Sequence, residues 1–239
     1  MSEHLESLKV NHCRISTFKV EGKHYLRLLQ LNGINSLENF YFEEKPDSLE
    51  VVSLGNIEIS WEVIHEVIGS ASLIQNLSLL HIDGVDFETI STSFPLLKKL
   101  SISYPKATVN LSDRLQFATL GILEIEWDEA DQHFAKWVEK LILKCPELFE
   151  CVVTGFISKI SSDKLCSNMQ SASMLYERFR DVKFEKVRFT VTMQCLGVIG
   201  GHVESARGFK GTISKNNGAC GQYVANVIIL AKKVALHHL

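Results

Sequence analysis

A few short segments carry residue types that hold metal ions in other proteins. His65-Glu66 resembles the start of a zinc-protease helix, which needs a second histidine one turn later to complete the site. Gly69 occupies that position, so the motif is incomplete. His237 and His238 have no cysteine or aspartate beside them, and we interpret them as a solvated tail. The sequence therefore predicts no metal site.

Glycine-rich stretches and cysteines are the other candidates for chemistry. The segments 197–201 and 218–221 lack both the glycine frame and the Lys-Ser/Thr pair of a phosphate-binding loop. Cys220 beside Gly221 would be a nucleophile only if a distant histidine approached it. This leaves one alternative open, an enzyme with a cysteine-dependent site in the Gly-rich carboxyl-terminal region. We predict no catalytic site, no enzyme activity and no cofactor.

Composition narrows the class of protein. Of 239 residues, 46% are hydrophobic and 22% are charged, which is typical of a folded chain with a substantial core. A net charge of −3 gives no basic excess for nucleic acid or an anionic membrane. The amino terminus has no signal-peptide pattern and no apolar run is long enough to span a membrane, so the six cysteines are expected to be reduced. We expect an intracellular protein of the cytoplasm or nucleus without nucleic-acid or membrane partners.

A repeated spacing organises the first two thirds of the chain. The spacing is apolar-x-x-apolar-x-apolar, led by leucine. Its matches are Leu5-Leu8-Val10, Leu26-Leu29-Leu31, Leu49-Val52-Leu54, Leu77-Leu80-Ile82, Leu97-Leu100-Ile102, Leu120-Leu123-Ile125 and Leu148-Cys151-Val153. Their leading residues lie 20 to 28 residues apart, the period of a leucine-rich repeat.

The repeat has a direct structural interpretation. Counting the leading leucine as position 1, positions 4 and 6 are two apart on a strand and point to the same side. Position 9 completes the apolar rung, with Cys13, Ile34, Ile57 and Val85. One rung cannot bury itself, and stacked rungs form a parallel sheet over a continuous core. We predict an α/β leucine-rich-repeat solenoid with a curved parallel sheet on its concave face and short helices and loops on its convex face.

The segments between rungs fit this interpretation. Ser60 is placed to cap a helix over 61–68 that ends at Gly69. A longer helical pattern follows Asp128 and includes Phe134, Trp137, Val138, Leu141 and Ile142. The triplet in 37–42 is too close to its neighbours to be a rung, so we place it on the convex return of the second repeat.

The pattern decays after about residue 157. We expect a solenoid over residues 1–157, a polar loop or insert over 158–181, and a terminal repeat with a carboxyl-terminal cap over 182–239. Within this last region, 183–193 alternates as a strand does. Residues 223–236 fit either a strand or a capping helix, and the sequence leaves that choice open.

Positions 3, 5 and 7 of each repeat point away from the core and would line the concave face, the usual binding surface of such solenoids. This outward row mixes apolar side chains with scattered charge and becomes acidic toward its end, which suits a protein or peptide partner. The predicted partner-binding residues are Lys9, Gln30, Asn32, Ser53, His81, Asp83, Lys99, Ser101, Ile122, Glu124, Glu126 and Glu150.

Three segments resemble a known family. Leu5-Glu-Ser-Leu8-Lys-Val10-Asn-His-Cys13, Phe94-Pro95-Leu96-Leu97-Lys-Lys-Leu100-Ser-Ile102 and Cys145-Pro146-Glu-Leu148-Phe-Glu-Cys151-Val-Val153 look like the irregular leucine-rich repeats of plant F-box proteins. In that family the repeats imply a substrate-recognition surface of a ubiquitin ligase, and a separate F-box docks a Skp-type adaptor.

The resemblance implies a protein-interaction module without catalytic activity. Because the first rung begins at Leu5, we expect the recognition half alone, with Skp-type adaptor binding only if an F-box is supplied from outside this chain. A leucine-rich-repeat fragment of an immune-type receptor is a further alternative.

Overall fold

The computed structural model describes seven stretches of the chain. These are residues 5–21, 25–103, 111–127, 134–157, 188–195, 211–215 and 223–230. The chain forms two compact units, of which unit 1 comprises Met1–Leu123 and Lys140–Leu148, and unit 2 comprises Glu124–Glu139 and Phe149–Leu239. The predicted polar segment 158–181 lies outside the described residues, so the predicted domain boundaries stay predictions.

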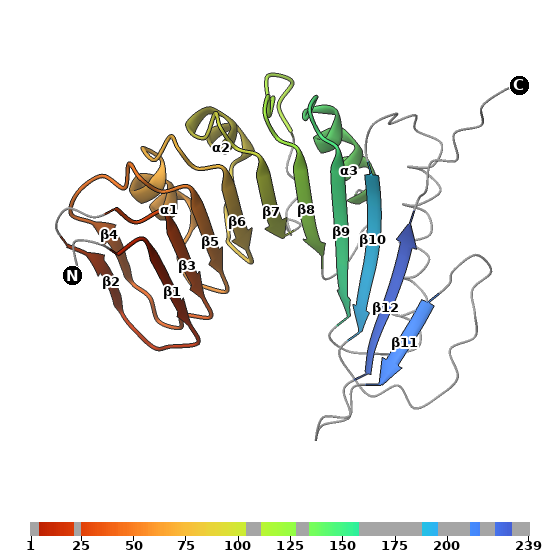
Figure 1. Ribbon diagram of the computed structural model, residues 1–239, viewed down its shortest axis with the longest axis horizontal. Helices are drawn as coiled ribbons and strands as arrows, with labels where there is room; N and C mark the ends of the chain where they lie inside the picture. The colour runs from red at the N-terminus through yellow and green to blue at the C-terminus, as the bar shows by residue number, and fades with distance from the viewer. Residues whose placement is uncertain are drawn as a thin grey trace, which may run out of the picture. The chain divides into compact units, whose positions relative to one another are not determined.

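Five strands of unit 1 form a parallel ladder in sequence order (Figure 1). They are β1 (Ser7–Asn11), β3 (Leu28–Asn32), β5 (Val51–Gly55), β6 (Asn76–Leu80) and β7 (Lys99–Ser103). Equivalent repeat positions pair without a shift, so that Leu8 lies opposite Leu29, and Leu29 opposite Val52. Parallel neighbours require a crossover, and each crossover here is the rest of one repeat. The prediction of an α/β fold with a mostly parallel sheet is confirmed.

The apolar repeat positions fill the core of this ladder. In the second and third repeats, positions 1, 4 and 6 are at most 1% exposed, namely Leu26, Leu29, Leu31, Leu49, Val52 and Leu54. In the first repeat, Leu5, Leu8 and Val10 are only half-buried, because β1 is the last strand on its side of the sheet. Burying a side chain of this size contributes about 1.5–3 kcal/mol relative to leaving it in water. Each inner rung therefore depends on both of its neighbours.

A second periodic feature marks the end of each strand. Position 8 adopts the left-handed conformation in four successive repeats, at His12, Gly33, Asn56 and His81, with φ between 50° and 62°. The N–H groups of the first three donate to the position 7 carbonyl of the next repeat at 2.9–3.0 Å. Only Gly33 also lacks room for a side chain, because a Cβ there would lie 2.6 Å from His12 Nδ1.

This periodicity corrects the fourth repeat, which begins at Ile74 and not at Leu77. Leu77 lies opposite both Val52 and Leu100, the position 4 residues of its neighbours. The Ile74 N–H donates to the carbonyl of the residue three before it, as the leading residues of the third, fifth and seventh repeats do. Ile82, not Val85, therefore holds position 9.

Because the fourth repeat begins at Ile74, two of its side chains point in the opposite directions to those predicted. Leu79 is 1% exposed and faces the core, whereas Leu80 is half-buried and lies at outward position 7. The rung 77-80-82 was predicted because the outward Leu80 stands three residues after Leu77, where the repeat spacing requires a core residue.

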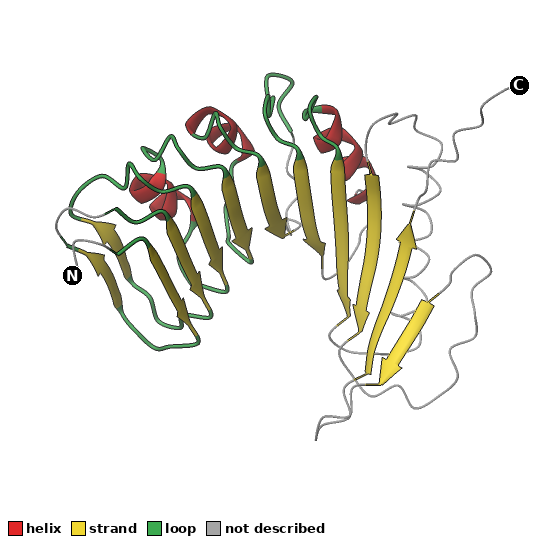
Figure 2. Ribbon diagram, viewed as in Figure 1, coloured by secondary structure: helices red, strands yellow, loops and turns green. Residues whose placement is uncertain are grey.

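The returns between rungs contain short elements (Figure 2). β2 (Thr17–Val20) and β4 (Asn39–Phe42) lie in the first two returns and pair in parallel as a second, two-stranded sheet. The third and fourth returns hold α1 (Trp61–Ile68) and α2 (Phe87–Ser93). The prediction that 37–42 lies on the return of the second repeat is confirmed, although the segment forms a strand that the sequence analysis did not pair.

Helix α1 has the predicted bounds, and its caps differ from expectation. Ser60 is extended but its side chain makes no capping hydrogen bond, and Gly69 is right-handed rather than left-handed. Gly69 is needed for space, because a Cβ there would lie 2.5 Å from the His65 carbonyl oxygen. The helix is fixed sideways to α2 by a hydrogen bond from Trp61 Nε1 to Thr89 Oγ1 at 2.9 Å.

Strand β8 (Ile122–Trp127) and helix α3 (Phe134–Leu143) each have residues in both units. All five residues of the predicted helical pattern, from Phe134 to Ile142, are buried. Trp127 stacks on Phe134 with ring centroids 5.0 Å apart. No helix among the described residues has the length and apolar character needed to span a bilayer.

Unit 2 continues with strands of both directions. β9 (Glu150–Ile157) pairs in parallel with β10 (Arg188–Cys195), whose other neighbour is antiparallel β12 (Tyr223–Leu230). β11 (Gly211–Lys215) then pairs with β12, also antiparallel. The open choice for 223–236 is thus resolved over Tyr223–Leu230, which forms a strand.

Candidate partner-binding surfaces

The centre of the outward face in unit 1 is a row of position 5 side chains. Lys9, Gln30, Ser53, Ser78 and Ser101 follow one another in register from β1 to β7. Because neighbouring strands lie about 4.8 Å apart, these side chains form one continuous line. Lys9 is exposed, the next three are half-buried, and Ser101 is 7% exposed. The ladder therefore brings four of the predicted partner-binding residues together: Lys9, Gln30, Ser53 and Ser101.

The remaining predicted residues flank this row or lie in unit 2. Asn32 at position 7, and Lys99 and Ile122 at position 3, are half-buried and belong to unit 1. Glu124 and Glu126 on β8, and Glu150 on β9, are half-buried and belong to unit 2. A role for any of them in binding stays a prediction.

His81 and Asp83 do not lie on the outward row, and their predicted placement there is wrong. Both follow β6, at positions 8 and 10 of the corrected fourth repeat. The outward residues of β6 are Asn76, Ser78 and Leu80, all half-buried.

His81 and Asp83 instead line a depression of about 520 Å³ at the carboxyl ends of β3, β5 and β6, which we call the carboxyl-end pocket. Its lining residues are Asn35, Asn56, Ile57, Glu58, Ile59, Ser60, His81 and Asp83. All of them come from positions 8–12 of three consecutive repeats. This pocket was not predicted from the sequence, although the shared repeat positions of its lining residues are a signal that indicates it.

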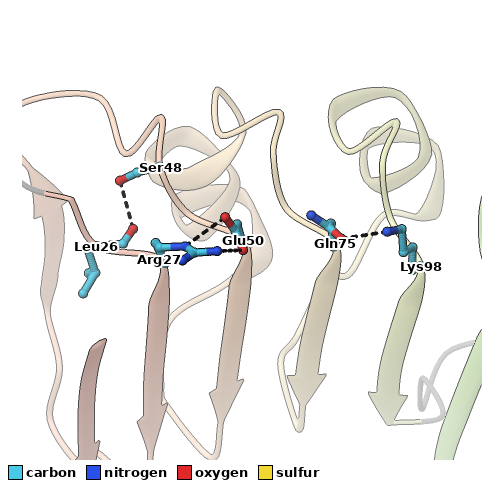
Figure 3. Close-up of polar contacts among 6 residues, drawn as sticks. All are labelled: Leu26, Arg27, Ser48, Glu50, Gln75 and Lys98. Atoms are coloured by element: carbon cyan, nitrogen blue, oxygen red, sulfur yellow. Dashed lines mark hydrogen bonds and ion pairs between the residues drawn. The ribbon is translucent and has the colours of Figure 1, made fainter. Parts of the chain in front are cut away.

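A polar row at the opposite, amino-terminal ends of the strands was also missed. Position 2 holds Glu6, Arg27, Glu50, Gln75 and Lys98 in successive repeats. The Arg27 guanidinium donates to both carboxylate oxygens of Glu50 at 2.9 and 2.8 Å, and Lys98 Nζ donates to Gln75 Oε1 at 2.9 Å (Figure 3). Beside this row lies a depression of about 350 Å³. It is flanked by Tyr25 and Leu73, which are 59% and 44% exposed.

The pair between Arg27 and Glu50 makes a titration prediction. The hydrogen bonds from Arg27 lower the pKa of Glu50 below its ordinary value of 4.5. A carboxyl group with a lowered folded-state pKa stabilises the fold above its unfolded pKa, and that contribution is lost as the pH falls through the folded value. We expect the carboxyl ¹³C signal of Glu50 to titrate below 4.5 and to return to about its ordinary value in Arg27→Ala.

Lys98→Ala is the matched control for this titration, because it removes the other position 2 cation and should leave Glu50 unchanged. The same Glu50 midpoint in Arg27→Ala and the unmodified chain would contradict the assignment.

Two of the histidine and cysteine residues that could bind a metal ion or act as a nucleophile have hydrogen-bond partners within the fold. His65 Nε2 lies 2.8 Å from Ser93 Oγ and the ring is half-buried, whereas Glu66 is exposed. Cys145 Sγ donates to the Leu141 carbonyl at 3.2 Å, and burial raises the pKa of Cys145 to about 12. In the described part of the chain, no three His, Cys, Asp or Glu residues could jointly hold a metal ion. Cys220, His237 and His238 lie outside the described residues.

Comparison with known proteins gives one informative similarity. The chain is 25% identical over 175 residues to the F-box/LRR-repeat protein At1g67190 of Arabidopsis thaliana. The match covers 69% of this chain and 42% of the relative. No family model and no solved structure matches the chain. The similarity to the F-box/leucine-rich-repeat family, which the repeat motifs indicated, is confirmed by this match.

Proposed function

We propose that the chain is a leucine-rich-repeat solenoid that binds a protein or peptide through its outward strand face. The observation that carries this proposal is the register of five parallel strands, which aligns one outward side chain per repeat into continuous rows. Repeat proteins use such extended faces to bind partners. The rows mix apolar, amide, hydroxyl and cationic groups, as the core and rim of a protein interface do.

The similarity to an F-box/LRR-repeat protein extends the proposal to the kind of complex. The chain would supply the substrate-recognition part of a ubiquitin-ligase receptor, and an F-box outside residues 1–239 would engage the Skp-type adaptor. Binding would involve Lys9, Gln30, Ser53 and Ser101 at the centre of the face in unit 1. For unit 2, taken by itself, the proposed binding residues are Glu124, Glu126 and Glu150.

A double substitution at the centre of the face tests this function. Ser53→Arg with Ser78→Arg places two long cationic side chains on neighbouring strands, and both would obstruct a partner lying across the row. We expect the proteins that the unmodified chain enriches from a lysate of its source to fall at least tenfold, measured by quantitative mass spectrometry of pull-downs.

The matched control is Ser70→Arg with Ser72→Arg. These serines are exposed in the return between α1 and β6, so the control adds the same charge away from the outward face. Equal capture by both double variants and the unmodified chain, with unchanged thermal melting, would remove the outward face as the binding surface.

A further inference from the structure

The carboxyl-end pocket is held in shape by hydrogen bonds between repeats. The Asn56 N–H donates to the Leu80 carbonyl at 3.0 Å, and the Trp61 N–H donates to the Asp83 carbonyl at 2.9 Å. Asn56 Nδ2 donates to Asn32 Oδ1 at 3.1 Å. A pocket whose walls are already fixed requires less ordering when it takes a ligand. Its volume of about 520 Å³ lies within the range of ligand-binding pockets, and all of its lining residues belong to unit 1.

The charge of the lining points to a cation. Glu58 and Asp83 hold position 10 in the third and fourth repeats, and both are exposed. Among the described residues, no ion pair with either carboxylate is found, and the lining contains no lysine or arginine. Position 10 is Arg14 and Asn35 in the first two repeats, these two acids in the third and fourth, and Lys106, which lies outside the described residues, in the fifth.

The other lining groups favour one kind of cation. Ile57 and Ile59 are the apolar residues of the lining, and because they are 5% and 6% exposed they offer an aliphatic stem only a small contact area. Amide oxygens of Asn35 and Asn56 are further acceptors at its edge. A guanidinium presents five donors in one plane and is more weakly hydrated than an ammonium, so it suits two carboxylates and amide oxygens over an apolar floor.

We propose that the carboxyl-end pocket binds an arginine side chain of the protein partner. The guanidinium pairs with Glu58 and Asp83, and the aliphatic stem lies against Ile57 and Ile59. This inference rests on the proposed function, because the partner supplies the arginine. It adds a specificity site at the strand ends to the outward face.

A short peptide tests the pocket without the partner. The probe is acetyl-Gly-Arg-Gly-amide, added to the ¹⁵N-labelled full chain, and its comparator contains citrulline, which has nearly the same shape and no charge. We expect the arginine peptide to shift the amide NMR signals of Asn35, Asn56 and Asp83 saturably and the citrulline peptide to leave them in place. Added salt should weaken the binding, because the pocket is open to solvent.

Charge-removing variants complete the test. Glu58→Gln with Asp83→Asn should weaken arginine-peptide binding at least tenfold. The affinity of each single variant should lie between that of the double variant and that of the unmodified chain. Glu62→Gln with Glu66→Gln removes the same charge from exposed positions of α1 and should bind as the unmodified chain does. All four residues are exposed, so the variants should fold, and the spectra themselves report folding.

Three results would overturn the pocket assignment: no saturable shift with the arginine peptide, an equal shift with citrulline, or unchanged affinity in the pocket variant. The experiment is separate from the test of the outward face. A failed peptide experiment leaves capture through Ser53 and Ser78 standing, and lost capture in the serine variant leaves the peptide result standing.

Discussion

Leu79→Ala is expected to lower the free energy of unfolding by about 2–5 kcal/mol, measured by denaturant titration. Leu79 holds position 6 of the fourth repeat, is 1% exposed, and lies between Leu54 and Ile102 on the neighbouring strands. Removing its side chain loses the transfer free energy of the buried methyl groups and leaves a cavity between two rungs.

Leu80→Ala is the matched control, because the same change is made one residue away. Leu80 holds outward position 7 and is half-buried, so water already reaches it and no enclosed cavity forms. We expect a cost well below that of Leu79→Ala. A larger loss at Leu80 than at Leu79 would restore the rung 77-80-82 and contradict the corrected register.

This pair of leucines shows where the sequence was ambiguous. Core and outward positions alternate on a strand, so one misplaced residue in the register reverses every side chain. The sequence 74–82 contains apolar residues in both phases, because Leu80 is apolar although it faces outward. Ile74 fits the leading position as well as leucine does, but the predicted pattern required leucine there and therefore did not include it. The left-handed residue at position 8 shows where the fourth repeat begins. The spacing of apolar residues alone does not reveal this backbone conformation.

Elements with a strong local period were predictable. Helix α1 was predicted with its bounds, and the pattern of α3 was predicted because Phe134, Trp137 and Val138 recur on one helical face. The two-stranded sheet of β2 and β4 was not predicted. Each of its strands has only four residues, and the pairing joins segments 22 residues apart, so no local pattern connects them.

Of the two candidate surfaces, the outward row could be predicted from the sequence and the carboxyl-end pocket could not. Side-chain direction on a strand follows from its period of two, and this placed Lys9, Gln30 and Ser53 correctly on one line. The carboxyl-end pocket is built from loops after the strands, where direction follows no simple period. Its acidic lining from Glu58 and Asp83 became visible only when equivalent positions of successive repeats were aligned.

The end of the ladder allows the other large effect to be predicted. Leu29 and Leu8 both hold position 4 and lie opposite each other on neighbouring strands. Leu29 is fully buried between two rungs, whereas Leu8 lies on the edge strand and is half-buried. We expect Leu29→Ala to lower the free energy of unfolding by about 2–5 kcal/mol, and Leu8→Ala to lower it by a distinctly smaller amount.

The comparison separates two accounts of how the repeats are stabilised. If each rung depends on burial by both neighbours, the cost of Leu→Ala follows the number of flanking rungs, because nearest-neighbour interfaces carry the stability of a repeat array. If local strand formation dominated, the two variants would lose similar amounts, since both replace leucine by alanine at the same strand position. Equal costs in denaturant titrations would therefore reject the neighbour-burial account.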